Sequence, residues 1–422
     1  MKKILLCLLL LVLTVSAFSC GGGTENAPTV VPTEGTSQMP EETILPTQAP
    51  SQGATKVPTK VPTQAPTQAP AKPVTYNADA LYAASKVQGR VAVYDYLSKR
   101  KEDRRGISLD YTASAIQFTA TCEGDVTLQV SAFPKGGTSA PYIFMNIYVD
   151  GKLMESRKAC GFSKETDIVI ATGLKRGTHT FLIERQNEAE KGQFYVNSVT
   201  LTGTLGKKPA NSKLYIEFIG ESITTGYGNL YPDDIGDAKA FKTDATSSCY
   251  QDGTRAWAYL TAKKLGADYS IVAQQGIGAS VGWQPHTMLQ TYTQTCYQTG
   301  RTQAWNFSRQ PDLIVINLGT NDLGVSHSTG KAAVQKGFVD LLKLVRSKNP
   351  NAKILWVYGA MDTSGAPVVE AAVKEAGGSS KGFYAYTKLV PNGEGGIGHP
   401  VVSAHQKNAG LVAAEIKRLF NF

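Results

Sequence analysis

The strongest constraint on the fold comes from residues 213–422, where short apolar runs alternate with segments of helical periodicity. Four runs predict buried strands: residues 214–219 and the apolar parts of DYSIVAQQG (268–276), PDLIVINLGTND (311–322) and AKILWVYGA (352–360). Helical spacing marks residues 254–266, the stripe Phe338, Leu341, Leu342, Val345 and the stripe Val412, Ile416, Leu419, Phe420, with Ser403 as the expected N-cap of the last helix. Strands that alternate with helices indicate an α/β domain whose parallel sheet is covered on both faces.

Three candidate functional residues follow separate strands closely: Ser222, Gly278 and Asn321. In an open parallel sheet, sites gather beyond the carboxyl ends of the strands, so we expect all three at one edge. Two simpler interpretations remain open. Ser222 by itself fits an ordinary strand-to-loop turn, and GTND (319–322) by itself fits a turn that starts a helix.

A serine hydroxyl needs a base to act as a nucleophile, and the chain has five histidines. His399 lies in the glycine-rich loop GEGGIGHP just before the last helix, and Pro400 restricts the conformation of that loop. A single loop histidine is usually structural, so His399 is informative only together with Ser222. The others are His179 in the preceding domain, His286 and His327 in loops at the same sheet edge, and His405 inside the last helix.

Asn321 adds a possible anion site. An amide beside a glycine at a strand end can donate a hydrogen bond to a developing oxyanion, and the backbone N–H groups of Ser222 and Gly278 can complete the hole. Each such donor contributes roughly 3 to 4 kcal/mol to lowering the barrier.

Together these residues resemble the SGNH (GDSL-type) hydrolase family. GESITTGYG (220–228), QQGIGAS (274–280), GTND (319–322) and GHP (398–400) match its four blocks in order and spacing, over residues 213–422. The resemblance implies that Ser222 is the nucleophile and His399 the base. It also implies an oxyanion hole formed by Ser222 N–H, Gly278 N–H and Asn321, with Gly276 and Ala279 as alternatives to Gly278.

One position departs from the family pattern. The family usually carries an aspartate three residues before the histidine, and here that residue is Gly396. The histidine still needs an acceptor to fix its tautomer, which a backbone carbonyl can supply. We therefore expect a Ser-His dyad, with Glu394 or Asp362 as the alternative orienting carboxylates.

The preceding segment, residues 76–208, consists of short alternating runs such as SAIQFTATC and DVTLQVSAF, separated by turn signals. This pattern predicts an antiparallel β-sandwich, either a carbohydrate-binding module or a structural neighbour of the hydrolase domain at 209–422. A sandwich immediately before an SGNH domain resembles carbohydrate esterase family 2. That resemblance implies removal of O-acetyl groups from hemicellulose-type polysaccharides, preferentially at primary 6-hydroxyls, without a cofactor.

The first 75 residues predict export rather than a fold. Lys2 and Lys3 precede an apolar run, which indicates a signal peptide over 1–19, and Cys20 resembles the lipidated cysteine of bacterial lipoproteins. Ordinary secretion is the alternative. Residues 20–75 are rich in Thr, Pro and Gln, bury little, and are expected to form a disordered tether. We therefore expect an extracellular protein anchored to the bacterial membrane.

The net charge of +9 raises the question of a nucleic-acid partner. The densest basic run, SKRKEDRRG (98–106), lacks stacking aromatics and any known module, so nucleic acid is excluded in favour of a solvated loop. Weak attraction to acidic wall polymers remains open. Asp233, Asp234 and Asp237 could hold calcium, but a polar loop is the simpler interpretation, and no metal site is predicted.

The cysteines and aromatic residues give further expectations. Four cysteines allow three pairings, of which Cys122–Cys160 and Cys249–Cys296 are the simplest. Trp283 follows the glycine block and is the expected sugar platform, although a core position remains open. The weaker platform candidates are Trp305, Tyr227 and Tyr250, whereas Trp257 and Trp356 are expected in the core.

Three functions remain after this reading of the sequence. The first is a polysaccharide O-deacetylase. The second is an SGNH esterase that acts on another ester, such as acetylated peptidoglycan or a lipid. The third is a surface carbohydrate-binding protein whose hydrolase domain has lost activity, for which the missing aspartate is the only support.

Overall fold

The computed structural model describes residues 72–97, 103–134, 143–160, 165–232, 248–298, 303–324 and 330–422. The expected signal peptide, Cys20, His327 and the three aspartates at 233, 234 and 237 lie outside these residues. Among the described residues, none of the helices has the length and hydropathy needed to cross a membrane.

The N-terminal domain is built on one antiparallel sheet around its own apolar core. Its strands are β1 (Val74–Asn77), β2 (Lys86–Gln88), β3 (Ala92–Leu97), β4 (Asp103–Ser108), β5 (Ala115–Pro134), β6 (Ile143–Val149), β7 (Lys152–Cys160), β8 (Glu165–Arg185) and β9 (Gly192–Leu205). The order is β3-β4-β9-β5-β8-β6-β7, with β1 on β9 and β2 on β5. Register shifts interrupt the long β5–β8 and β5–β9 ladders, and such bulges let a strand bend around a core.

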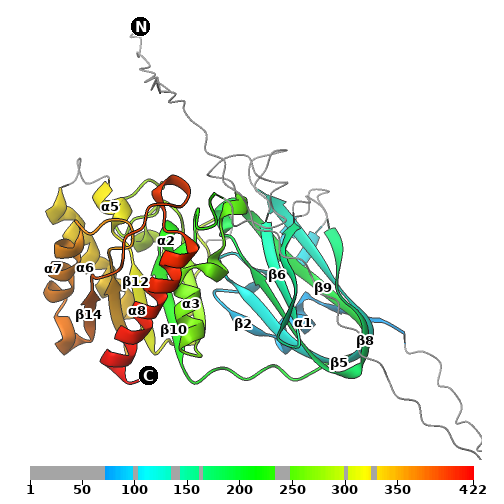
Figure 1. The fold of residues 1–422 in the computed structure, drawn as a ribbon. Coiled ribbons are helices and arrows are strands. Elements are labelled where there is room, and N and C mark those ends of the chain that lie inside the picture. Colours follow the sequence, from blue (N-terminus) through cyan, green and yellow to red (C-terminus); the bar gives the residue numbers. More distant parts are fainter. Residues whose placement is uncertain are drawn as a thin grey trace, which may run out of the picture. The chain divides into compact units, whose positions relative to one another are not determined.

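The second domain holds a five-stranded parallel sheet in the order β11-β10-β12-β13-β14 (Figure 1). These strands are β10 (Tyr215–Gly220), β11 (Asp268–Ala273), β12 (Leu313–Asn317), β13 (Lys353–Val357) and β14 (Phe383–Tyr386). The helices are α2 (Ser222–Thr225), α3 (Trp257–Lys264), α4 (Met288–Thr291), α5 (Thr320–Gly324), α6 (Lys331–Lys348), α7 (Ala366–Glu375) and α8 (Val402–Phe420). The α/β fold and the preceding antiparallel domain are both as the sequence predicted.

Alternate residues of the central strand β12 enter different cores. Leu313 and Val315 pack with α3 and α8, whereas Ile314 and Ile316 pack with α6 and α7. Both faces of the sheet are therefore covered, which explains why the strands are apolar throughout rather than alternating. Trp257 and Trp356 are at most 1 % exposed and belong to these cores, as expected.

Four local expectations are wrong. Val74 and Thr75 pair with β9 instead of belonging to the tether. The next residues form helix α1 (Ala78–Ala84), which fits no strand pattern. Helix α8 starts at Val402 with Val401 at its N-cap and no side-chain cap, so Ser403 lies inside the first turn. The disulfides expected of the cysteines are not formed: none of Cys122, Cys160, Cys249 and Cys296 is in a disulfide, and all four are buried.

Candidate active site

The turn after β10 presents Ser222 at the carboxyl edge of the sheet. All six residues of β10 are buried, and the strand pairs in parallel with β11 and β12. Glu221 has extended backbone dihedrals, and Ser222 begins the single turn α2. A Cβ at Gly220 would lie 2.0 Å from the Thr224 hydroxyl oxygen, so glycine is required for this tight exit from the strand. Ser222 is 7 % exposed.

The His399 loop packs directly on the chain that follows this turn. Gly396 N–H donates to the carbonyl oxygen of Gly228 at 2.9 Å, and a Cβ at Gly228 would lie within 2.9 Å of Gly396 backbone atoms. Gly228 also has a φ of +66°, which favours glycine. This close backbone contact brings His399 Nε2 to 2.8 Å from Ser222 Oγ, across 177 positions of sequence.

The other imidazole nitrogen faces two backbone carbonyls. His399 Nδ1 lies 2.9 Å from the Gly396 oxygen and 3.1 Å from the Ile397 oxygen. Carbonyls only accept, so Nδ1 carries the proton and Nε2 is the acceptor for the Ser222 hydroxyl. Burial lowers the pKa of His399 below its ordinary value, against the opposing effect of these two carbonyls. The imidazole is thus neutral and oriented as a base.

Neither alternative carboxylate is bonded to His399 within the described part of the chain. Glu394 is exposed, and its backbone N–H donates to Asn392 Oδ1. Asp362 is also exposed and accepts hydrogen bonds from Ser364. The acceptor that the sequence left open is therefore the backbone of residues 396 and 397.

Two of the three expected oxyanion donors are available. Within the described residues, no acceptor is recorded for the N–H groups of Ser222 and Gly278. The alternative donor Ala279 N–H is already bonded to Asp322 at 2.8 Å. A Cβ at Gly278 would lie 1.6 Å from the Val281 oxygen, so only glycine fits this turn.

Asn321 differs from the expectation for a free donor. Its Nδ2 donates to Glu221 Oε2 at 2.9 Å and to the Ile277 oxygen at 2.8 Å. A carboxamide has two N–H groups, so both are occupied. Asn321 can therefore donate to an oxyanion only by giving up one of these bonds.

Two buried acids near the site were not identified from the sequence. Asp322 accepts hydrogen bonds from the N–H groups of Ala279, Ser280 and Val281, and so fixes the turn after Gly278. Glu221 is fully buried, and desolvation raises its pKa to about 8. Acidic residues directly beside Ser222 and Asn321 were the signal that could have indicated them.

The aromatic candidates divide by exposure. Trp283 is 70 % exposed, so the core interpretation is wrong, and its backbone N–H donates to the Gly276 oxygen at 2.9 Å. Tyr227 contacts His399 edge-to-face, with ring centroids 4.9 Å apart. Tyr250 is 1 % exposed and packs in a core cluster, whereas Trp305 lies beside Arg90, 5.5 Å from its guanidinium carbon.

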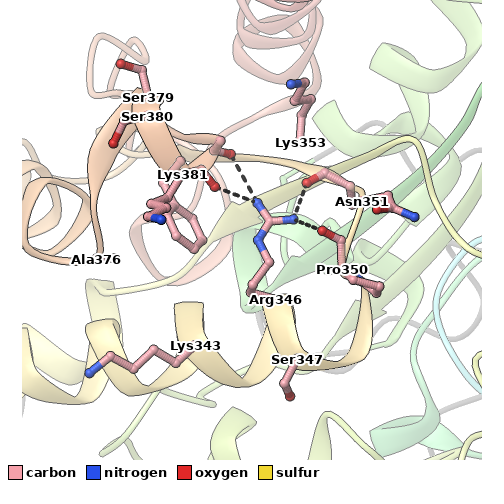
Figure 2. Close-up of a pocket in the computed structure, with 13 residues that line it drawn as sticks. Lys343, Arg346, Ser347, Pro350, Asn351, Lys353, Ala376, Ser379, Ser380 and Lys381 are labelled. Carbon is pink, nitrogen blue, oxygen red and sulfur yellow. Dashed lines mark hydrogen bonds between the residues drawn. The ribbon is translucent and has the colours of Figure 1, made fainter.

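A hollow of about 750 Å³ lies elsewhere, among residues that precede β13 and β14. This is the amino edge of the sheet, opposite to Ser222. Figure 2 shows Arg346 at its centre, and its guanidinium donates to the carbonyls of Asn349, Pro350, Ala352, Lys381 and Gly382. Arg346 thus holds the loop after α6 and the loop before β14 by hydrogen bonds, and its guanidinium is not available to bind an anion. The described residues contain no group of three or more His, Cys, Asp or Glu that could hold a metal ion.

The comparisons with known proteins agree with this architecture. Residues 218–387 match the GDSL-like Lipase/Acylhydrolase family, so the chain contains a GDSL-like acylhydrolase domain. The matched range includes three of the four blocks that indicated it, and GHP (398–400) lies beyond its end. Each relative named below has an esterase activity in its name.

Two curated relatives align with parts of the chain. A cellulase/esterase of Acetivibrio thermocellus is 29 % identical over 264 residues, which are 59 % of this chain and 31 % of the relative. An acetylxylan esterase/glucomannan deacetylase of Cellvibrio japonicus is 28 % identical over 204 residues, 43 % of this chain and 52 % of the relative. The alignments thus span about a third and about half of the two relatives.

Solved structures share the two-domain fold. An acetyl xylan esterase from Butyrivibrio proteoclasticus superposes with a TM-score of 0.69 at 19 % identity, covering 83 % of this chain and 99 % of that one. A family two carbohydrate esterase from Clostridium thermocellum, solved with cellohexaose, gives 0.66 at 23 % identity, covering 80 % and 99 %. At these identities the likeness shows the fold, which is that of the family two carbohydrate esterases.

Proposed function

We propose that the protein is an extracellular serine esterase that removes O-acetyl groups from a hemicellulose-type polysaccharide, at primary 6-hydroxyls, by a Ser-His dyad. The observation that carries this proposal is the 2.8 Å contact between Ser222 Oγ and His399 Nε2, with Nδ1 held by two carbonyls. This is the geometry that a serine nucleophile and its general base require.

The reaction follows from the positions of these atoms. His399 Nε2 takes the Ser222 proton while Oγ attacks the acetyl carbonyl carbon. The negative charge on the carbonyl oxygen is stabilised by the N–H groups of Ser222 and Gly278, and by Asn321 if it exchanges its bond to the Ile277 oxygen. His399 then gives the proton to the departing sugar oxygen, which leaves acetyl-Ser222. Water attacks this ester with His399 as base, and acetate and free Ser222 are released.

The choice of a polysaccharide ester rests on two observations. Two relatives that are 28 % and 25 % identical to this chain are named acetylxylan esterase/glucomannan deacetylase. Trp283 offers an exposed indole next to the glycine block, and an exposed aromatic ring is the surface on which a sugar ring stacks. Export and lipidation at Cys20 belong to the same proposal, since a polymer substrate lies outside the cell.

The second candidate is an esterase for another acyl ester, such as acetylated peptidoglycan or a lipid. The dyad supports this candidate as well as the first, because the 2.8 Å contact between Ser222 and His399 does not depend on which alcohol leaves. A non-catalytic carbohydrate-binding protein is the third, and the intact dyad geometry argues against it.

One experiment separates all three. Wild-type protein, Ser222→Ala and the control Ser403→Ala, an exposed serine of α8, are incubated with acetylated glucomannan and with a simple aryl acetate. We expect wild type and the control to release acetate from both, and Ser222→Ala from neither. Release from the aryl acetate alone supports the second candidate, and no release supports the third. NMR of the residual acetyl groups on a defined oligosaccharide then tests the 6-O preference.

A further inference from the structure

We propose that Glu188, a residue of the N-terminal domain, is a positioning residue for the nucleophile turn and the glycine block of the hydrolase domain. This inference rests on the proposed function. It gives the N-terminal domain a role in catalysis that is separate from sugar binding. The Glu188 side chain connects the loop after β10 with the loop after β11, both at the carboxyl edge of the parallel sheet.

Glu188 lies in the connection between β8 and β9, immediately before the short 3₁₀ helix η1 (Ala189–Lys191). Its side chain has no exposure to solvent. The connection is held by Arg185, which is also fully buried and whose guanidinium donates to the carbonyls of Leu109, Asn187, Glu188 and Gly192 at 2.6 to 2.8 Å. A carboxylate on such a fixed segment is well suited to position what it binds.

One carboxylate oxygen reaches the nucleophile turn through a chain of three hydrogen bonds. Gln251 Nε2 donates to Glu188 Oε1 at 3.0 Å and to Thr225 Oγ1 at 2.8 Å. Thr225 Oγ1 in turn donates to the carbonyl oxygen of Ser222 at 2.9 Å. Because the threonine proton goes to Ser222, its oxygen must accept from Gln251. Every bond in the chain therefore has a defined direction.

The other carboxylate oxygen binds the glycine block. Gln275 N–H donates to Glu188 Oε2 at 2.9 Å, three residues before Gly278. The same side chain thus fixes both segments whose N–H groups face the oxyanion in the proposed mechanism, one after β10 and one after β11. Small displacements of such donors reduce transition-state stabilisation more than ground-state binding.

Isosteric substitutions break this chain at either end. Glu188→Gln offers only one acceptor in place of two, so either the Gln251 bond or the Gln275 bond is lost. Thr225→Val keeps the shape of the side chain but removes the donor to the Ser222 carbonyl. The matched control is Glu184→Gln, another buried acid of the same domain, whose partner is the Tyr259 hydroxyl of α3 at 2.9 Å.

The test uses the full chain with an aryl acetate and measures kcat, KM and Tm. We expect Glu188→Gln and Thr225→Val each to lower kcat about tenfold, which is the size of one lost hydrogen bond, with KM changing less than about twofold. Glu184→Gln should keep kcat within about twofold.

Two results overturn the proposal: a kcat for Glu188→Gln equal to that of Glu184→Gln, or a kcat for Thr225→Val within about twofold of the wild-type value. Hydrogen exchange of the peptides that contain residues 222–227 and 275–281 keeps the proposal testable without turnover. Faster exchange there in Glu188→Gln, but not in Glu184→Gln, supports it even if wild type hydrolyses no ester, in which case the proposed function alone fails. Unchanged exchange in Glu188→Gln and Thr225→Val overturns it.

Discussion

Arg90 of the N-terminal domain forms a buried ion pair with Glu217 of β10, with 3.4 Å between its terminal nitrogen and Glu217 Oε2. The Arg90 side chain is fully buried, and that of Glu217 is 4 % exposed. The guanidinium also donates to the carbonyls of Tyr292 and Gln294 and lies over the rings of Tyr292, Trp305 and Phe307. The two domains therefore share a charged contact inside the hydrolase core.

Arg90→Met should destabilise the whole chain by about 3 to 5 kcal/mol, because Glu217 would remain buried without its cation. Arg90→Met/Glu217→Gln should recover at least about 1 kcal/mol of this loss, because the glutamine keeps the bond from the Tyr292 hydroxyl without a charge. Urea unfolding of both variants is the measurement. Equal destabilisation in the two would contradict this account of the ion pair.

The dyad gives a second prediction, for the pH dependence of activity. A general base works when it is neutral, and burial lowers the pKa of His399 below its ordinary value of 6.5. The acid limb of kcat/KM for an aryl acetate should therefore lie below pH 6.5, so activity is retained under mildly acidic conditions. Glu394→Gln should leave this limb unchanged, because the Glu394 side chain is exposed and His399 Nδ1 is bonded to the Gly396 and Ile397 oxygens instead. A limb above 6.5 that Glu394→Gln moves would show that this carboxylate orients the histidine in solution.

The general order of the fold and the position of the site were predictable, because they depend on periodicity and on strand ends. Apolar runs followed by Ser222, Gly278 and Asn321 place these residues at one edge of any parallel sheet. What periodicity cannot give is the approach of a distant loop. The contact of Gly396 with Gly228 decides where His399 lies, and it depends on two glycines without side chains to indicate a partner.

The missed residues share a different cause. Arg90 and Glu188 belong to the N-terminal domain but bind residues of the hydrolase domain. In a sequence, single polar residues between β-strands cannot be told from ordinary surface residues. The expected cysteine pairings were wrong because a sequence that predicts export permits disulfides without requiring them, and none of the four buried thiols is in a disulfide. Asn321 was recognised as a donor, but its two existing acceptors, Glu221 Oε2 and the Ile277 oxygen, come from other loops and could not be paired with it from the sequence.

The side-chain amide of Asn321, whose two N–H groups are both hydrogen-bonded, leads to a third prediction. If Asn321 exchanges a bond for the oxyanion, Asn321→Ala should lower kcat by about 10² to 10³ with little change in KM. Glu221→Gln should lose much less, because its carboxamide oxygen can still accept from Asn321 Nδ2. Steady-state kinetics with an aryl acetate distinguish the two variants. A loss below about threefold in Asn321→Ala would leave the two backbone N–H groups as the whole oxyanion hole.

Trp283 gives a fourth prediction, on substrate choice. Its indole is 70 % exposed, so truncation should remove stacking area for a polymer without disturbing the core. We expect Trp283→Ala to raise KM about tenfold for acetylated glucomannan and to leave the kinetics on an aryl acetate within about twofold. Phe422→Ala, a change at another exposed aromatic residue, is the control. Equal effects on both substrates would instead show that Trp283 maintains the conformation of the loop that carries Gly278, rather than binding the polymer.

The buried imidazole of His405 gives the last prediction, for stability against pH. Its Nδ1 accepts a hydrogen bond from the backbone N–H of Trp257 at 3.2 Å, and burial together with the nearby His399 lowers its pKa to about 3. Below pH 6.5 His405 is protonated in the unfolded chain but stays neutral in the folded chain. The free energy of unfolding should therefore fall as the pH is lowered from 6.5 to 3. His405→Asn keeps an acceptor for Trp257 but does not titrate. The change in the free energy of unfolding that His405→Asn causes should therefore be more favourable at pH 4 than at pH 7.5, by about 2 kcal/mol or more.

His179 provides a control of opposite sign in the same measurement. It pairs with Asp150 at 2.8 Å, which raises its pKa, so its contribution is complete below pH 6.5 and is lost as pH rises through the folded pKa. His179→Gln should thus be most destabilising under acidic conditions, where His405→Asn is most favourable. Urea unfolding at pH 4, 5.5 and 7.5 compares the two. If both variants change with pH in the same direction, the assignment of one protonated and one neutral histidine in the folded state is wrong.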